Sequence, residues 1–244
     1  MNPGALLATT RRVLTQLRHD RRTLALMMFV PIVLEGLLAW VYEGTPIFDR
    51  IGAALLGIFP FIVMFLVTSV ATLRERTSGT LERLLTMPLA KIDLILGYAL
   101  AFGLVAIVQS LLVASCALWL FGLDVAGPAW LLIVVALLDA LLGTALGLFV
   151  SAFAATEFQA VQFLPAIVLP QFLLCGLLVA RDQLPDVLHA ISNVLPLSYA
   201  VDAMSHVARS ADVTGDVLTD LLVVAAFVVA ALSLGAATLR RRTP

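Results

Sequence analysis

The sequence predicts an all-α polytopic membrane protein with six transmembrane helices and both termini in the cytoplasm. Three observations lead to this fold class. Hydrophobic residues make up 61% of the 244 residues and charged residues only 13%, which is unlike a soluble globular domain. Six apolar runs are long enough to cross a hydrocarbon core of about 30 Å. Lys and Arg residues collect in the segments that this topology places inside the cell.

Residues 1–22 come before the first long apolar run. Their leucines and valine alternate with arginines in a pattern typical of an amphipathic helix, which we expect to lie at the inner membrane surface. A basic flank that only orients the first span is the alternative. The run that follows is long enough for a full span and lacks a small-residue cleavage pattern, so we expect it to stay in the membrane.

Six spans follow in order, within a single transmembrane domain over residues 1–244. The third is long enough to tilt or to extend past the interface. Gly143 and Gly147 form a G-x-x-x-G in the fourth span, which would let a neighbouring helix approach closely. Cys116 and Cys175 fall within spans, where they are expected to act as small apolar residues. The predicted spans are residues 23–42, 51–73, 92–121, 129–153, 158–180 and 217–239.

The positions of the basic residues predict the orientation. With both ends inside, twelve of the fifteen Lys and Arg residues face the cytoplasm, and only Arg50, Arg181 and Arg209 lie outside. An odd number of spans would move the arginines at 240–242 to the other side. The polar segment 74–90, between the second and third spans, is therefore predicted to be cytoplasmic.

Residues 74–90 are longer and more charged than a turn between two neighbouring spans requires. Glu82 falls in the first turn of a predicted two-turn helix, where the helix dipole favours an acid, and Pro88 ends that helix. Leucines at 81, 84 and 85 share one face of it. The segment is predicted to be a docking element for another protein.

Residues 181–216 lie on the predicted outer side. They contain two apolar-faced stretches that are separated at Pro196, and each is too short to cross the bilayer. We expect a pair of short helices that lie at the outer interface or re-enter the protein.

Four polar residues inside the predicted spans are candidates for a substrate path. Glu35 and Asp139 are acids without a central Lys or Arg partner, and an acid at mid-membrane costs about 2.5–3.5 kcal/mol on insertion scales. Gln109 and Gln171 add neutral polar groups. The hypothesis is that they line a path for cationic or amphipathic cargo. Interhelical hydrogen bonding that sets the packing is the alternative for each.

Motifs for chemistry within the chain are absent from the sequence. There is no G-x-x-x-x-G-K-[ST] loop, because the one lysine, Lys91, follows Leu89-Ala90. H-E-x-x-H and G-x-S-x-G are absent as well. We therefore expect no catalytic, cofactor or metal site in this chain, and ATP with Mg would have to be bound by another chain.

The segment from Arg74 to Leu89 resembles the coupling-helix signature of the ABC-2 type transporter permeases, especially those similar to daunorubicin-resistance efflux permeases. The match covers Arg74-Glu75-Arg76, Gly79 to Leu85 and Pro88-Leu89. A second match runs from Leu169-Pro170 to Ala203 and resembles the last third of the family. It departs from the family pattern at Leu195 and His206.

This resemblance implies the membrane subunit of an ATP-binding cassette exporter in a bacterial inner membrane. Its implied partners are a separate ABC ATPase subunit, a second permease subunit that is identical or paralogous, and the membrane lipids, with no nucleic acid. The cargo would be a drug or another small, lipid-like molecule. The residues that the resemblance assigns to ATPase contact are Glu75, Gly79, Thr80, Leu81, Glu82, Arg83 and Leu84.

One other class of transporter uses the same acids differently. In a proton-coupled secondary transporter, Asp139 and Glu35 would be the coupling residues. That class predicts an internal repeat, and spans one to three show no clear repeat in spans four to six.

Overall fold

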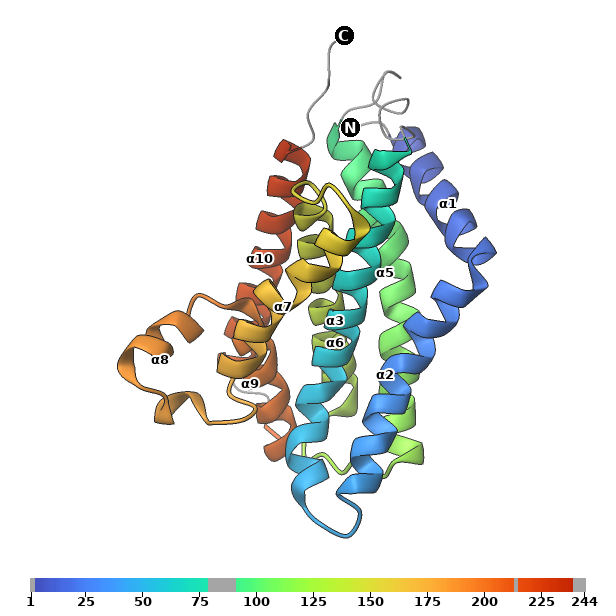
Figure 1. The fold of residues 1–244 in the computed structure, drawn as a ribbon. Coiled ribbons are helices and arrows are strands. Elements are labelled where there is room, and N and C mark those ends of the chain that lie inside the picture. The colour runs from blue at the N-terminus through green and yellow to red at the C-terminus, as the bar shows by residue number, and fades with distance from the viewer. Residues whose placement is uncertain (1–2, 79–90, 213–214, 239–244) are drawn as a thin grey trace.

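The computed structural model describes residues 3–78, 91–212 and 215–238. The described residues form a bundle of helices without a strand (Figure 1), which confirms the predicted all-α fold class. Six of the helices are long and apolar enough to cross a membrane, as predicted. They are α2 (Arg21–Val41), α3 (Ile47–Thr77), α5 (Lys91–Ser115) with its π-helical extension η1 (Cys116–Leu120), α6 (Ala129–Val150), α7 (Glu157–Leu174) and α10 (Gly215–Thr238).

Helices α3 and α6 lie at the centre of the bundle and approach each other closely at two glycines. A Cβ on Gly143 would lie 2.3 Å from the carbonyl oxygen of Phe61, and one on Gly147 would lie 2.6 Å from that of Phe65. Such distances are far below van der Waals contact, so only glycine permits this spacing. The G-x-x-x-G of the fourth span therefore packs against the α3 backbone.

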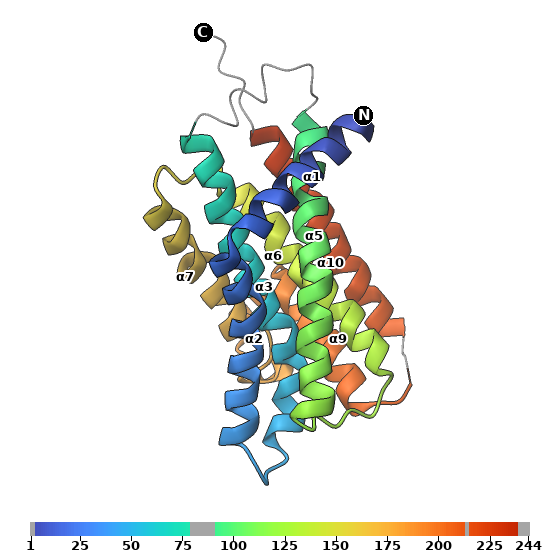
Figure 2. The same ribbon diagram turned by 90° about the vertical axis from the view of Figure 1, so that its right-hand side faces the viewer.

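The two ends of the bundle differ in composition. The terminal end holds the start of α1 (Pro3–His19), the end of α3, the start of α5 and the end of α10 (Figures 1 and 2). All three tryptophans of the chain lie at the opposite, far end: Trp40, Trp119 and Trp130 are 74%, 84% and 62% exposed. Exposed tryptophans are typical of a membrane–water interface, so this girdle marks one boundary of the bilayer.

Helix α1 packs along α5 at the terminal end (Figure 2). The hydroxyl of Thr10 donates a hydrogen bond to the carbonyl of Gly97 at 3.2 Å, and a Cβ on Gly97 would lie 2.7 Å from the Cβ of Thr9. Val13 and Leu17 are buried in the same face. One face of the amphipathic segment is therefore covered by protein.

The junction between α1 and α2 is formed by Asp20. Its carboxylate accepts hydrogen bonds from the hydroxyl of Thr23 at 2.6 Å and from the Thr23 backbone N–H at 3.1 Å, and these bonds lower the pKa of Asp20. This cap explains why α2 begins at Arg21, two residues before the predicted start of the first span.

Other predicted boundaries need correction. Residues 74–77, assigned to the polar interruption, form the last turn of α3, and that helix also starts four residues earlier than predicted. The fifth span, predicted over 158–180, stops as α7 at Leu174, because Gly176 adopts a φ of +94°, which few residues other than glycine adopt. Helix α6 ends at Val150 instead of residue 153.

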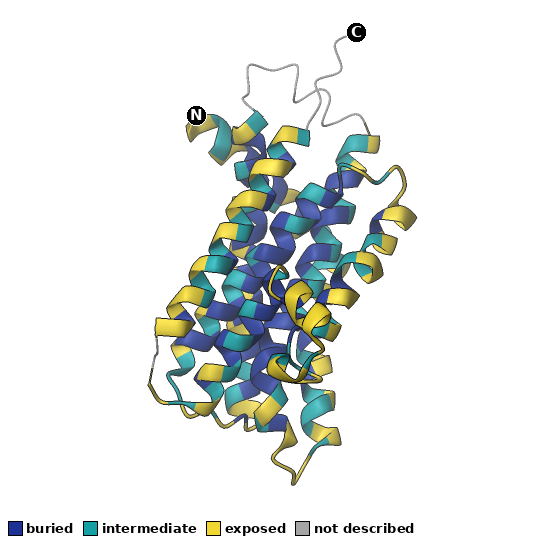
Figure 3. Cartoon of the chain, turned by 90° about the vertical axis from the view of Figure 1, so that its left-hand side faces the viewer, coloured by how far each residue is buried: buried dark blue, intermediate teal, exposed yellow. Residues whose placement is uncertain are grey.

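Residues 181–212 contain one short 3₁₀ turn and two helices. The longer helix, α9, is buried against α3, α6 and α10, whereas the shorter one, α8, projects from the side of the bundle with every residue except Ser192 exposed (Figures 1 and 3). The segment therefore re-enters the protein through α9 alone. The elements are η2 (Arg181–Gln183), α8 (Asp186–Ser192) and α9 (Pro196–Arg209).

Arg181 holds this outer segment together. Its Nε donates to the hydroxyl of Ser192 at 2.8 Å, and its other nitrogens pair with Asp202 and Asn193. Burial raises the pKa of Asp202, and the charge of Arg181 opposes that shift. The guanidinium thus links η2, α8 and α9 through one side chain.

Candidate coupling site and adjoining cavity

Glu75 occupies the last turn of α3, four residues before the region outside the described residues. Its carboxylate accepts two parallel hydrogen bonds from Arg12 of α1: Nη1 donates to Oε1 and Nη2 donates to Oε2, each at 3.0 Å. The two side chains are only 26% and 13% exposed. A bidentate pair in this partly buried setting fixes orientation as well as distance.

Tyr98 of α5 completes this group of side chains, which we call the Arg12–Glu75–Tyr98 cluster. The Arg12 Nη2 donates to the Tyr98 hydroxyl oxygen at 2.8 Å, and the hydroxyl donates to Glu75 Oε2. The guanidinium also lies 5.6 Å from the centre of the Tyr98 ring, within cation–π range. One cluster therefore joins α1, α3 and α5 at the terminal end.

Of the residues predicted to couple to an ATPase, the structure describes only Glu75. It lies inside a helix, bound to Arg12, instead of in an exposed loop. The other predicted coupling residues lie outside the described residues: Gly79, Thr80, Leu81, Glu82, Arg83 and Leu84.

Sequence reasoning did not find Arg12 or Tyr98. They are 63 and 23 positions from Glu75 along the chain, and nothing in the sequence indicates that α1 crosses α5. The one available signal was the basic, amphipathic character of residues 1–22, which placed arginines near the cytoplasmic ends of the spans.

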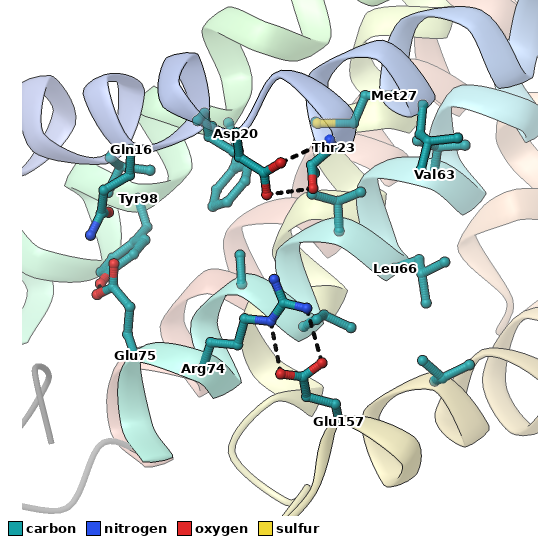
Figure 4. Close-up of a pocket in the computed structure, with 18 of the residues that line it drawn as sticks. Gln16, Asp20, Thr23, Met27, Val63, Leu66, Arg74, Glu75, Tyr98 and Glu157 are labelled. Carbon is teal, nitrogen blue, oxygen red and sulfur yellow. Dashed lines mark hydrogen bonds and ion pairs between the residues drawn. The ribbon is translucent and has the colours of Figure 1, made fainter. Parts of the chain in front are cut away.

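Beside the cluster lies a cavity of about 680 Å³ between the α1–α2 junction and α3, bordered also by α5 and α7 (Figure 4). Most of its wall is apolar and includes Met27, Val63 and Leu66. Its polar groups gather toward the terminal end of α3. They are Gln16, Asp20, Thr23, Arg74, Glu75, Tyr98 and Glu157.

Two of these polar groups bond to each other. Arg74 Nε donates to Glu157 Oε1 at 2.8 Å, and Arg74 Nη2 donates to Glu157 Oε2 at 3.0 Å, which links α3 to the first turn of α7 (Figure 4). Both side chains are more than half exposed, so this pair is expected to contribute less than about 1 kcal/mol.

Glu35 and Asp139 are fully buried, and their carboxyl oxygens have no hydrogen-bond partner among the described residues. Both lie against glycines of α3. A Cβ on Gly52 would lie 3.3 Å from Glu35 Oε1, and one on Gly57 would lie 3.0 Å from Asp139 Oδ2. The structure thus brings the two acids to one helix, in the far half of the bundle.

The two candidate glutamines bridge helices. Gln109 Nε2 donates to the carbonyl of Met27 at 2.6 Å, and Gln171 Oε1 accepts from the N–H of Leu197 at 3.4 Å. Neither glutamine lines the cavity beside the cluster, and neither acid does. A place for these four residues in a substrate path stays a prediction, and cargo could reach Asp139 only if α3 moves relative to α6.

Asp139→Asn tests that place, because it keeps the size of the side chain and removes its ability to carry charge. If Asp139 lies on the path, we expect a variant that inserts normally to export cationic cargo several-fold more slowly. Uptake into inverted vesicles measures this rate. Unchanged transport of every cargo tested would remove Asp139 from the path and leave it a packing role.

No group of three or more His, Cys, Asp or Glu side chains that could hold a metal ion occurs in residues 3–78, 91–212 and 215–238. What the described site offers is a mechanical linkage between three helices and a partly apolar cavity next to it.

A sequence profile of the family described as "ABC-2 type transporter" matches residues 4–208. The chain is 27% identical over 176 residues to the "Probable multidrug ABC transporter permease YbhR" of Escherichia coli K12, which covers 71% of this chain and 48% of the relative. It is 24% identical over 212 residues to the "Linearmycin resistance permease protein LnrN" of Bacillus subtilis, covering 86% of this chain and 55% of the relative. The chain spans about half the length of these curated relatives.

Proposed function

Because this chain belongs to the ABC-2 type transporter family, we propose that it is the membrane-spanning permease subunit of an ATP-binding cassette exporter. The observation that supports this role best is the bidentate pair between Arg12 and Glu75. It connects the end of α3, next to the expected ATPase-docking segment, to a helix residue 63 positions earlier in the chain. The backbone joins the docking segment directly to α3 and α5, and a connection of this kind would extend its displacement to α1.

The orientation supports the same proposal. Arginines of α1 and of its junction with α2, together with Arg74, Arg76 and Lys91, lie in the terminal half of the bundle, and the exposed tryptophans lie at the far end. An excess of Lys and Arg is typical of the cytoplasmic side. In this proposal the terminal end, where the Arg12–Glu75–Tyr98 cluster lies, faces the cytoplasm.

Energy for export comes, in this proposal, from ATP and Mg bound by a separate ABC ATPase subunit. The sequence has no nucleotide-binding loop of its own. Residues 79–84 would make the contact, with Glu82 as the central acid. Closure of the ATPase would push this segment, and Glu75 would pass the displacement to α1 through Arg12 and to α5 through Tyr98.

Movement of α3 would then alter the packing at the centre of the bundle. Helix α3 contacts α2, α5, α6, α7 and α9, so a shift of this helix is transmitted widely. A second permease subunit, identical or paralogous, would complete the pathway. The names of the relatives, which refer to multidrug transport and linearmycin resistance, favour amphipathic small molecules as cargo.

Glu82→Lys tests the docking assignment. We expect this permease to insert normally and to support ATP hydrolysis with little or no export, because a reversed charge at the contact would uncouple the two subunits. Hydrolysis and cargo uptake are measured in the same inverted vesicles that contain the cognate ATPase.

The matched control is Asp182→Lys, the same charge reversal at an exposed residue of η2, in the segment predicted to lie outside. It should export at the wild-type rate. Wild-type export by Glu82→Lys would remove Glu82 from the contact, and failure of any ABC ATPase to co-purify with the wild-type permease would contradict the proposed function.

A further inference from the structure

We propose that the cavity beside the cluster binds single-chain amphiphiles with a cationic head group, with the chain between α2 and α3 and the head near Asp20, Glu75 and Glu157. This inference rests on the proposed function, because it names the class of cargo that such a permease would accept. It assigns binding to residues outside the predicted path of Glu35, Gln109, Asp139 and Gln171.

The shape of the cavity suits an elongated apolar ligand. Its volume of about 680 Å³ falls within the range of about 300–1,000 Å³ that is usual for small-molecule sites. Met27 and Val30 line it from α2, and Val63, Val67 and Ala71 line it from α3, at intervals of about one helical turn. An acyl chain could therefore lie along the helix axes with apolar side chains on both sides.

Two of the residues that line the cavity are exposed on the outside of the bundle, so a ligand could enter the cavity from the bilayer. Leu26 of α2 is 62% exposed and Val161 of α7 is 44% exposed, although both line the cavity. Exposed apolar side chains within candidate membrane spans face lipid or another membrane subunit. An amphiphile already inserted in the cytoplasmic leaflet could thus reach the cavity sideways, without passing through water.

The charges of the lining favour a cation. Three carboxylates and one guanidinium line the cavity, and all four lie toward its terminal end. Counting Arg12, which neutralises Glu75, the group still carries a net negative charge. A partly apolar cleft with a net charge concentrates ligands of the opposite sign. Two hydrogen bonds from Thr23 hold the Asp20 carboxylate in place, so a cationic head would meet an acceptor that is already oriented, and the Glu157 carboxylate also lines the cavity.

Equilibrium binding to the purified permease in nanodiscs of zwitterionic lipid tests this proposal. Dodecyltrimethylammonium, dodecyl sulfate and dodecyl maltoside carry the same chain with cationic, anionic and neutral heads, and binding to empty nanodiscs is subtracted. We expect the cation to bind at least about tenfold more tightly than the anion, a difference of about 1.4 kcal/mol. The neutral head should fall between them.

Two sets of variants locate the binding. Val67→Trp and Ala71→Leu fill the cavity from α3 and should weaken all three ligands, whereas Val229→Trp, at a 63% exposed position of α10, should not. Asp20→Asn combined with Glu157→Gln should remove most of the preference for the cation, and asparagine preserves the helix cap. Size-exclusion profiles identify any variant that misfolds, and the two filling variants make the test independent of one substitution.

Equal binding of the cation and the anion, or unchanged binding in both filling variants, would overturn the proposal. This test needs no ATPase, so its failure is separate from failure of the proposed function. If the cation does not bind but Glu82→Lys uncouples export, only the cargo class is wrong. If it binds but no ABC ATPase associates with the permease, the site exists and the transport role is wrong.

Discussion

A Gly143→Ala permease is expected to be markedly less stable than the wild type, although the change adds only one methyl group. The new Cβ would lie 2.3 Å from the carbonyl oxygen of Phe61 and 3.0 Å from its carbonyl carbon. These are backbone atoms of a central helix, so α3 and α6 must separate to relieve the contact. Overpacking of this kind costs about 1–3 kcal/mol, and the restricted site places Gly143→Ala toward the upper limit.

The thermal midpoint of the purified protein measures this effect. A loss of about 2–3 kcal/mol should lower the midpoint by roughly 4–12 °C in a chain of this length. The matched control is Gly235→Ala in α10, where the nearest atoms to a new Cβ are 3.7 Å away. That variant should be as stable as the wild type or slightly more so, because alanine favours the helix. Equal midpoints for the two variants would show that α3 and α6 are not packed in this way.

The second large effect is expected at the Arg12–Glu75–Tyr98 cluster. Arg12→Gln and Glu75→Gln each leave one charged group partly buried without its partner, which is costly because the exposed fractions are only 26% and 13%. In either variant the end of α3 loses its connection to α1. We expect the cargo exported per ATP hydrolysed to fall at least about tenfold, with ATP hydrolysis itself retained.

Arg11→Gln is the control for these variants. Arg11 precedes Arg12 on the same helix, is exposed, and can be changed without touching Glu75. Export by this variant should equal that of the wild type. If Arg11→Gln and Arg12→Gln were equally impaired, the total charge of α1 would matter, and the specific contact with Glu75 would not.

The sequence was sufficient to predict the membrane class and the number of candidate spans. Each of these follows from local composition and from the length that a bilayer requires. The G-x-x-x-G at 143–147 was also visible, although its partner was not, because the contact is with the α3 backbone and backbone atoms carry no sequence signal.

The predicted helix boundaries that were wrong depend on single residues, whose effect a hydropathy average over many residues does not detect. Hydropathy continued the fifth span to residue 180, but Gly176 turns the chain and ends α7 at Leu174. Polarity assigned residues 74–77 to a loop, but Arg and Glu are good helix formers, and Glu75 is held by Arg12. One helix therefore ends earlier than hydropathy predicts, and the other extends further into a polar stretch than polarity predicts.

For the two buried acids, the sequence identified the residues but could not predict their contacts. Sequence alone identified Glu35 and Asp139 as unusual, and the structure shows that each fits against a glycine of α3. Nothing in the sequence linked Gly52 to Glu35 or Gly57 to Asp139, because those contacts depend on how α2 and α6 are rotated about their axes. Residue type marked these acids as candidates for a substrate path, which stays a prediction, and only the packing shows where they lie.

Exchanging the charges of Arg12 and Glu75 tests most directly whether α3 transmits the displacement of the docking segment to α1. Cargo export and ATP hydrolysis would be measured together in inverted vesicles for Arg12→Glu, for Glu75→Arg and for the variant with both changes. Each single change should abolish coupled export, since it places two like charges together at the cluster. The double exchange should restore a large part of the export per ATP. No recovery in a double variant that folds and binds the ATPase would mean that the Arg12–Glu75 contact does not carry the coupling.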